Sequence, residues 1–156
     1  MYIYVTSKLH IMQTEIKHTF FFPHPIEIVW DYLTKPELLS EWLMENDIKP
    51  IVGHQFQFRA KPAPSIEFDG ICYCKILSVV PFKQLSYSWK CSPTDNGHKI
   101  DTIVMWTLAP KDNGTELNLF QTGFKEKENH LFYMAMNDGW TKQAEKLLQT
   151  LNTNLK

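Results

Sequence analysis

Two side chains in this sequence, His54 and Tyr87, have types suited to proton transfer. An imidazole titrates near neutral pH and a phenol can donate a proton, so together they can serve as acid and base. Both fall on the inward side of segments in which apolar and polar residues alternate. They are the pair we nominate if the protein is an enzyme. Their more ordinary role is to bond each other, Gln121 or water inside a core.

Other patterns of reactive residues are weak. Cys72, Cys74 and Cys91 include no CxxC pair, and the six histidines have no HxH or HxxxH spacing. Zinc needs about four ligands, and this chain clusters no such set. There is no GxSxG motif and no glycine-rich phosphate loop. We predict three buried, inert thiols, no metal, no cofactor and no catalytic residue.

The charge distribution argues against nucleic acid and membranes as partners. The chain has 16 basic and 17 acidic residues, a net charge of −1, and a single arginine, Arg59. Binding to nucleic acid needs a basic stripe, and apolar runs such as residues 103–106 are too short to span a bilayer. Residues 1–8 lack the basic start and apolar core of a secretory signal. We therefore predict a cytoplasmic protein.

Hydrophobic periodicity predicts the elements that position these residues. Alternation favours six strands, at residues 14–22, 52–60, 66–80, 85–91, 100–108 and 117–123. The i, i+3, i+4 pattern that follows Pro25 predicts a short helix, and a second begins near Pro36. Turn signals at residues 94–97 and 110–114 favour an antiparallel meander, with a bulge at Gly70. We expect one domain over residues 1–156, with residues 1–13 as a candidate extension.

Within residues 130–151, apolar side chains recur at helical spacing, which predicts a long C-terminal helix with one apolar side. The concave face of a curved sheet is exposed to solvent unless this helix covers it. Packing of the helix against that face would enclose a cavity. We expect Trp140 to face Trp106 or Tyr87 across that cavity. The alternative is a filled core, as in most protein interiors. The predicted lining consists of His54, Phe56, Phe58, Tyr87, Trp89, Trp106, Leu119, Gln121, Met136 and Trp140.

Several short motifs resemble one known family. Residues 22–34, FPHPIEIVWDYLT, resemble the opening of the activator of heat-shock protein 90 ATPase homologue-like (AHSA-type) family. Residues 68–70, 85–89, 114–117, 122–124 and 139–140 match further signatures in the same order, so the resemblance covers about residues 14–151. This family belongs to the START-like (SRPBCC) helix-grip superfamily.

The resemblance implies an α+β helix-grip fold. A curved antiparallel sheet of about six strands would wrap around the long C-terminal helix, and two short helices would follow the first strand. The sequence departs from the family pattern at Leu43 and Met44, where a second aromatic residue and a proline are usual. It departs again at Gly53-His54, where a glycine pair is common. Both places lie near the expected mouth of the cavity, so a ligand cannot be carried over from relatives.

Three functions remain open from the sequence. We favour a non-enzymatic protein that binds a small apolar molecule in the cavity. The alternative is a co-chaperone-like interaction module with a chaperone-type partner, as the resemblance implies for eukaryotic relatives. Those relatives have an additional N-terminal domain, for which this chain is too short. The third is a cyclase- or hydrolase-like enzyme that uses His54 and Tyr87 in the same cavity.

Overall fold

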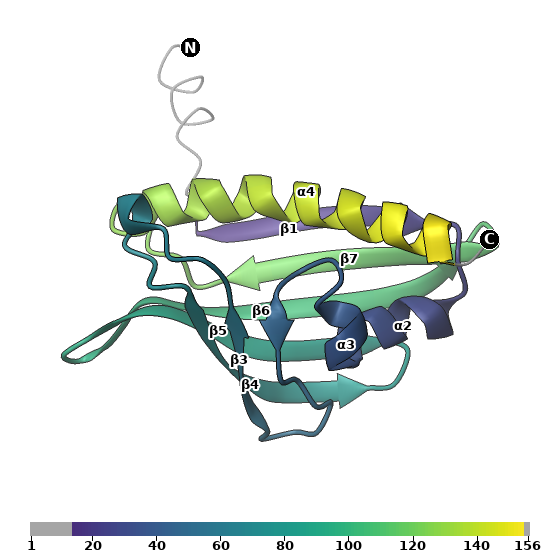
Figure 1. Ribbon diagram of the computed structural model, residues 1–156, viewed down its shortest axis with the longest axis horizontal. Helices are drawn as coiled ribbons and strands as arrows, with labels where there is room; N and C mark the ends of the chain where they lie inside the picture. Colours follow the sequence, from purple (N-terminus) through teal and green to yellow (C-terminus); the bar gives the residue numbers. More distant parts are fainter. Residues whose placement is uncertain (1–13, 155–156) are drawn as a thin grey trace, which may run out of the picture.

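The computed structural model describes residues 14–154, in which a curved sheet packs one face against a long helix (Figure 1). The strands are β1 (Glu15–Phe22), β2 (Glu45–Asn46), β3 (Gln55–Arg59), β4 (Ile71–Val80), β5 (Gln84–Thr94), β6 (Gly97–Lys111) and β7 (Gly114–Thr122). The helices are α2 (Ile26–Thr34), α3 (Pro36–Leu39), α4 (His130–Asn154) and the short 3₁₀ helix η1 (Pro64–Ile66).

The strand order is β1-β7-β6-β5-β4-β3-β2, and every neighbouring pair is antiparallel. The predicted meander and the α+β helix-grip fold are therefore confirmed. The sheet of the described residues has seven strands instead of about six. The extra strand is β2, in which Glu45 and Asn46 pair with Arg59 and Phe58. Two residues are too few to produce a readable alternation.

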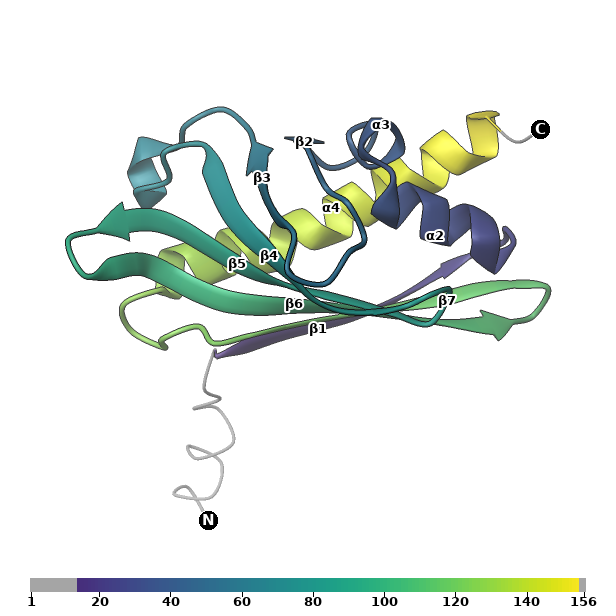
Figure 2. The same cartoon turned by 90° about the horizontal axis from the view of Figure 1, so that it is seen from below.

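The first strand, β1, pairs with the last, β7, and Ile16 lies opposite Gln121. Seen from below, the sheet curves around α4, and the short helices α2 and α3 lie beside the C-terminal half of α4 (Figure 2). The close approach of β1 to β7 explains the glycine at position 114. A Cβ there would lie 2.4 Å from the backbone oxygen of Phe22. Only glycine lets the two backbones come this close.

The segment 66–80 differs from its prediction. Its strand, β4, begins only at Ile71, and the bulge lies between Ile76 and Ser78 instead of at Gly70. Gly70 stands just before the strand with a φ of +93°, and a Cβ there would lie 2.6 Å from the Ala60 backbone oxygen. Gly70 therefore permits the tight turn that leads into β4. A bulge also favours a glycine with positive φ, so the sequence alone does not distinguish the two.

The long helix α4 confirms the prediction for residues 130–151 and continues to Asn154. It buries Phe132, Trp140, Ala144, Leu147 and Leu151, which recur at helical spacing. Within residues 14–154, no helix is long and apolar enough to cross a membrane. The main core therefore lies between the inward face of the sheet and this stripe of α4.

Candidate functional site

A cluster of aromatic side chains fills the space between the sheet and α4. Phe58, Tyr87, Trp89, Trp106 and Trp140 are each at most 2% exposed. The ring centroids of Trp89 and Trp140 lie 5.5 Å apart, and those of Trp106 and Trp140 lie 5.4 Å apart at nearly a right angle. Trp140 faces Trp106 as expected, but the two rings are in direct contact instead of lying across a cavity. Such edge-to-face contacts are favourable beyond the burial of their area.

Strand register explains why these rings fit together. Phe56, Cys74, Trp89 and Thr102 are successive cross-strand partners on β3, β4, β5 and β6. Large and small side chains alternate along this row. Because partners on adjacent strands lie about 5 Å apart, a thiol or a hydroxyl between two rings leaves those rings more space than a third large side chain would. The cysteine and threonine thus make room for the aromatic residues.

A chain of hydrogen bonds runs through the cluster. Trp140 Nε1 donates to Gln121 Oε1 at 2.9 Å, and Gln121 Nε2 donates to Thr102 Oγ1 at 3.0 Å. The Thr102 hydroxyl donates in turn to the Trp89 carbonyl at 2.8 Å. The buried amide of Gln121 therefore has partners on both of its polar atoms, as burial requires. The sequence prediction included Gln121 but missed its partner Thr102.

The hydroxyl of Tyr87 lies in the same core. Its oxygen accepts a hydrogen bond from Trp106 Nε1 at 2.9 Å. Burial raises the pKa of Tyr87 far above its ordinary value of 10.0, and the bond from Trp106 opposes this only in part. The phenol therefore stays protonated at any physiological pH.

The indole of Trp89 differs from its neighbours. Its Nε1 is buried, and it is the one buried side-chain nitrogen or oxygen in residues 14–154 without a hydrogen-bond partner. The indoles of Trp106 and Trp140 donate to Tyr87 and Gln121. A buried donor that lacks an acceptor costs about 1–3 kcal/mol. Native structures rarely leave one without a reason.

His54 does not join this cluster. It lies just before β3, is half-buried, and its Nε2 is 2.9 Å from the carbonyl oxygen of Asp47. The ring of Phe56 stacks on His54 and also contacts Tyr87. No hydrogen bond links His54 to Tyr87 within the described residues, so the structure does not assemble the nominated acid/base pair. The alternation that predicted an inward histidine ends where β3 begins, at Gln55.

The remaining predicted lining residues lie on the inward side. Leu119 is buried on β7, whereas Met136 on α4 is half-buried and packs against the core. One large neighbour was missed. Trp42 is buried beside Trp106, and its Nε1 donates to the Tyr32 carbonyl at 2.9 Å. Trp42 lies just after the end of α3, and its contact with Trp106 on the sheet depends on how this segment packs in the tertiary fold.

One protein-family model matches most of the chain. The family model described as "Activator of Hsp90 ATPase homolog 1-like protein" matches residues 23–152. The chain belongs to this family. No curated protein matches the sequence.

Solved structures of the same fold come from several bacteria. Protein MLL2253 of Mesorhizobium loti is 36% identical, with a TM-score of 0.80 over 90% of this chain and 98% of that one. BH1534 of Bacillus halodurans is 27% identical, with a TM-score of 0.70 over 86% and 94% of the two chains. The Aha1 dimer of Colwellia psychrerythraea has a TM-score of 0.73 over 91% and 98%. At 17% identity, that last likeness concerns the fold alone.

The cysteines of this family member are free and buried, as predicted. Burial raises the pKa of the Cys72 and Cys74 thiols well above the ordinary value of 9.0. The Sγ atoms of Cys72 and Cys91 lie 3.5 Å apart. No group of three or more His, Cys, Asp and Glu side chains in residues 14–154 is placed to hold a metal ion. The thiols therefore act as small core side chains.

An apolar groove of about 750 Å³ lies outside the predicted site. It runs between the helices α2 and α3 and residues 46–50, and the turn after β4 adds Phe82. The rings of Trp30 and Phe82 are 6.0 Å apart. Neither the sequence pattern nor the resemblance pointed to this groove, because its walls come from four separate segments. Its lining includes none of the ten predicted residues.

Proposed function

We propose that the protein is a non-catalytic binding module that holds a small apolar molecule between the sheet and α4. The proposed ligand carries one hydrogen-bond acceptor, which faces Trp89. The observation that carries this proposal is the buried indole N–H of Trp89, which has no acceptor in the described residues. A ligand carbonyl or ether oxygen would supply the missing partner.

The surroundings of Trp89 support an apolar ligand with little other polarity. Its ring neighbours are Phe58 and Trp140, with centroids 5.1 and 5.5 Å away. The nearby polar groups of Gln121 and Thr102 already bond each other and their neighbours. Among these groups, only the Trp89 N–H is left to offer a hydrogen bond, and apolar walls with few polar groups are typical of small-molecule sites. Because these rings are in contact, a ligand can enter only as they move apart, which limits it to about the size of one aromatic ring.

Two probes of similar size test the proposal. Acetophenone has a ketone oxygen that accepts a hydrogen bond, and ethylbenzene has none. In nitrogen-15 spectra, the five tryptophans give five indole N–H resonances. We expect acetophenone to shift the Trp89 resonance and to bind about tenfold more tightly than ethylbenzene, which corresponds to about 1.4 kcal/mol for one hydrogen bond. Native mass spectrometry of freshly purified protein would identify a natural ligand.

Trp89→Phe and Trp106→Phe form a matched pair, since each replaces a buried indole of the cluster by a phenyl ring. Trp89→Phe should remove the preference for acetophenone, whereas Trp106→Phe should keep it. A preference that persists in Trp89→Phe contradicts the proposal. So does a wild-type Trp89 resonance that acetophenone leaves in place up to its solubility. This second result needs no variant and decides even if Trp89→Phe fails to fold.

A second candidate function is a co-chaperone-like interaction module. The observation that favours it is the gathering of apolar side chains at the apolar groove. Phe82 lines this groove and is 43% exposed, and Pro50 lines it directly before the exposed Ile51 and Val52. Apolar patches of this kind mark protein-binding surfaces. The partner proposed here is a heat-shock protein 90-type chaperone, in line with the family to which the chain belongs.

A further inference from the structure

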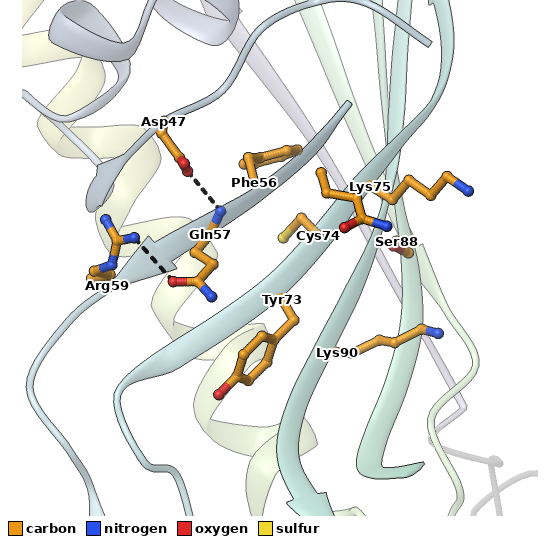
Figure 3. Close-up of a pocket in the computed structure, with 10 residues that line it drawn as sticks. Asp47, Phe56, Gln57, Arg59, Tyr73, Cys74, Lys75, Ser88 and Lys90 are labelled. Carbon is orange, nitrogen blue, oxygen red and sulfur yellow. Dashed lines mark hydrogen bonds between the residues drawn. The ribbon is translucent and has the colours of Figure 1, made fainter. Parts of the chain in front are cut away.

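Two of the three buried cysteines lie opposite each other on neighbouring strands. Tyr73 of β4 pairs with Lys90 of β5, and the next pair along this antiparallel register is Cys72 with Cys91. Figure 3 shows Tyr73 and Lys90 on these two strands, where they line a pocket of about 510 Å³. The Sγ atoms of Cys72 and Cys91 lie 3.5 Å apart, and both side chains are buried. The two thiols are therefore in contact across the strands.

The third cysteine, Cys74, has a different environment. Its cross-strand partner is Trp89, and its Sγ lies 3.8 Å from the backbone oxygen of Cys72. Residues two apart on one strand are separated by about 7 Å, and diagonal partners on adjacent antiparallel strands by about 7–8 Å. A disulfide needs Cβ atoms about 4 Å apart. The register therefore favours a link between Cys72 and Cys91 over either link that involves Cys74.

The Cys72–Cys91 pair is close to the geometry of a disulfide. The sulfur atoms of a disulfide are about 2.05 Å apart, so the two Sγ atoms need to approach each other by roughly 1.5 Å. Rotation about the Cα–Cβ bonds supplies such a movement. On the outer sides of the pair, Phe58 of β3 is the partner of Cys72, and Ile100 of β6 is the partner of Cys91. These neighbouring strands hold both cysteine backbones in register.

Burial decides where an oxidant can begin. Cys72 is 1% exposed and Cys91 is fully buried, so any reaction needs local opening of the sheet. Cys72 is the second residue of β4, which begins at Ile71, whereas Cys91 lies in the interior of β5. The ends of an element open at a lower free-energy cost than its interior. The Cys72 thiol therefore reaches solvent first.

We infer that Cys72 and Cys91 form an oxidation site, at which a small disulfide such as glutathione disulfide converts the two thiols to a cross-strand disulfide. In the opened state, the Cys72 thiol loses its proton to solvent and the thiolate attacks one sulfur of glutathione disulfide. The S–S bond of that molecule breaks, and one glutathione leaves as a thiolate that takes up a proton. A mixed disulfide remains on Cys72.

The second step closes the link within the protein. As the strand returns to its register, the Cys91 thiol loses its proton and attacks the Cys72 sulfur, which releases the second glutathione. In total, the two cysteines lose two electrons and two protons, and one glutathione disulfide is reduced to two glutathione thiols. Neither step needs the apolar ligand proposed above, so this inference is independent of that function.

The disulfide would join β4 to β5 beside the aromatic cluster. Cys74 and Trp89, which pair on the same two strands, lie two residues further along the register. A covalent link at this distance opposes the separation of β4 from β5. Oxidation therefore suppresses the local opening through which the buried Cys74 thiol meets solvent.

Mass spectrometry of native protein incubated with glutathione disulfide tests the inference. We expect the wild type to lose the mass of two hydrogen atoms and to keep one alkylatable thiol after denaturation, in place of three. Peptide mapping should find the link between Cys72 and Cys91, with Cys74 free. The same oxidation in urea is the control, because Cys74 should enter disulfides once the register is lost. Native oxidised protein should also react with iodoacetamide at Cys74 about tenfold more slowly than reduced protein.

Cys91→Ala and Cys74→Ala form a matched pair, since each removes one buried thiol. Cys91→Ala should stop at the mixed disulfide and keep one glutathione on Cys72, whereas Cys74→Ala should form the disulfide as the wild type does. The inference is overturned if the native wild type forms no internal disulfide, if its disulfide contains Cys74, or if oxidation leaves the alkylation rate of Cys74 unchanged. These three results need no variant and decide even if a variant fails to fold.

Discussion

The indole N–H of Trp140 donates a hydrogen bond to the side-chain oxygen of Gln121 at 2.9 Å. This contact joins α4 to β7 at a place where both side chains are buried. It fixes the rotation of the helix over the sheet, since a turn of the helix would leave a buried donor and a buried acceptor unpaired. The aromatic contacts of Trp140 with Trp89 and Trp106 depend on that rotation.

Gln121→Leu should therefore destabilise the protein. The substitution leaves the N–H of Trp140 buried without an acceptor, which costs about 1–3 kcal/mol. Urea denaturation measures the change in the free energy of unfolding. In a double-mutant cycle, Gln121→Leu should cost less in a Trp140→Phe background, because the donor is already gone. Strictly additive costs would contradict the assignment of this bond.

The stability of the protein should fall at alkaline pH because of Tyr87. Burial raises the pKa of Tyr87 in the folded state well above its ordinary value of 10.0, while the unfolded chain ionises near that value. The folded state then keeps a proton that the unfolded state releases. This contribution is complete below about pH 9, and above pH 10 it declines by about 1.4 kcal/mol per pH unit.

Tyr87→Phe isolates this effect. The variant loses the hydroxyl, so it should be less stable at neutral pH, because Trp106 Nε1 loses its acceptor. Its unfolding free energy should also fall less steeply between pH 10 and pH 11 than that of the wild type. Urea titrations across this range compare the two slopes. Parallel slopes would show that the phenol ionises at an ordinary pKa.

The three cysteines should react slowly in the folded protein. All are buried, and burial raises the pKa of Cys72 and Cys74, so little reactive thiolate is present at neutral pH. Ellman's reagent should label the native protein only as fast as it opens, whereas all three thiols should react at once in denaturant. Rapid stoichiometric labelling of a native thiol would place that cysteine at the surface.

The interaction function can be tested at the apolar groove. Phe82→Asn replaces a groove residue, and its backbone φ of +65° is one that asparagine tolerates better than phenylalanine. Phe21→Asn is the control, because Phe21 and Phe82 are both 43% exposed. Phe82→Asn should weaken binding to a heat-shock protein 90-type chaperone about tenfold, with no effect from Phe21→Asn. Equal effects, or none, would argue against docking at this groove.

Much of the fold follows from local patterns that the sequence displays openly. Alternation along β5 and β6 places Tyr87, Trp89 and Trp106 on one face, and helical spacing places Trp140 on the buried side of α4. These periods are properties of the backbone, so they can be read without knowing what the faces meet. The two-residue strand β2 and the irregular start of β4 have no such period, and they were missed or misplaced.

The candidate sites depended on contacts that no local pattern contains. The sequence by itself determined the curved sheet, the covering helix and the aromatic inward faces. Tertiary structure decided that His54 bonds the Asp47 carbonyl, that Gln121 pairs with Trp140 and Thr102, and that the N–H of Trp89 lacks a partner. Hydrogen-bond partners depend on distances between segments far apart in the chain, which only strand register and the docking of α4 fix.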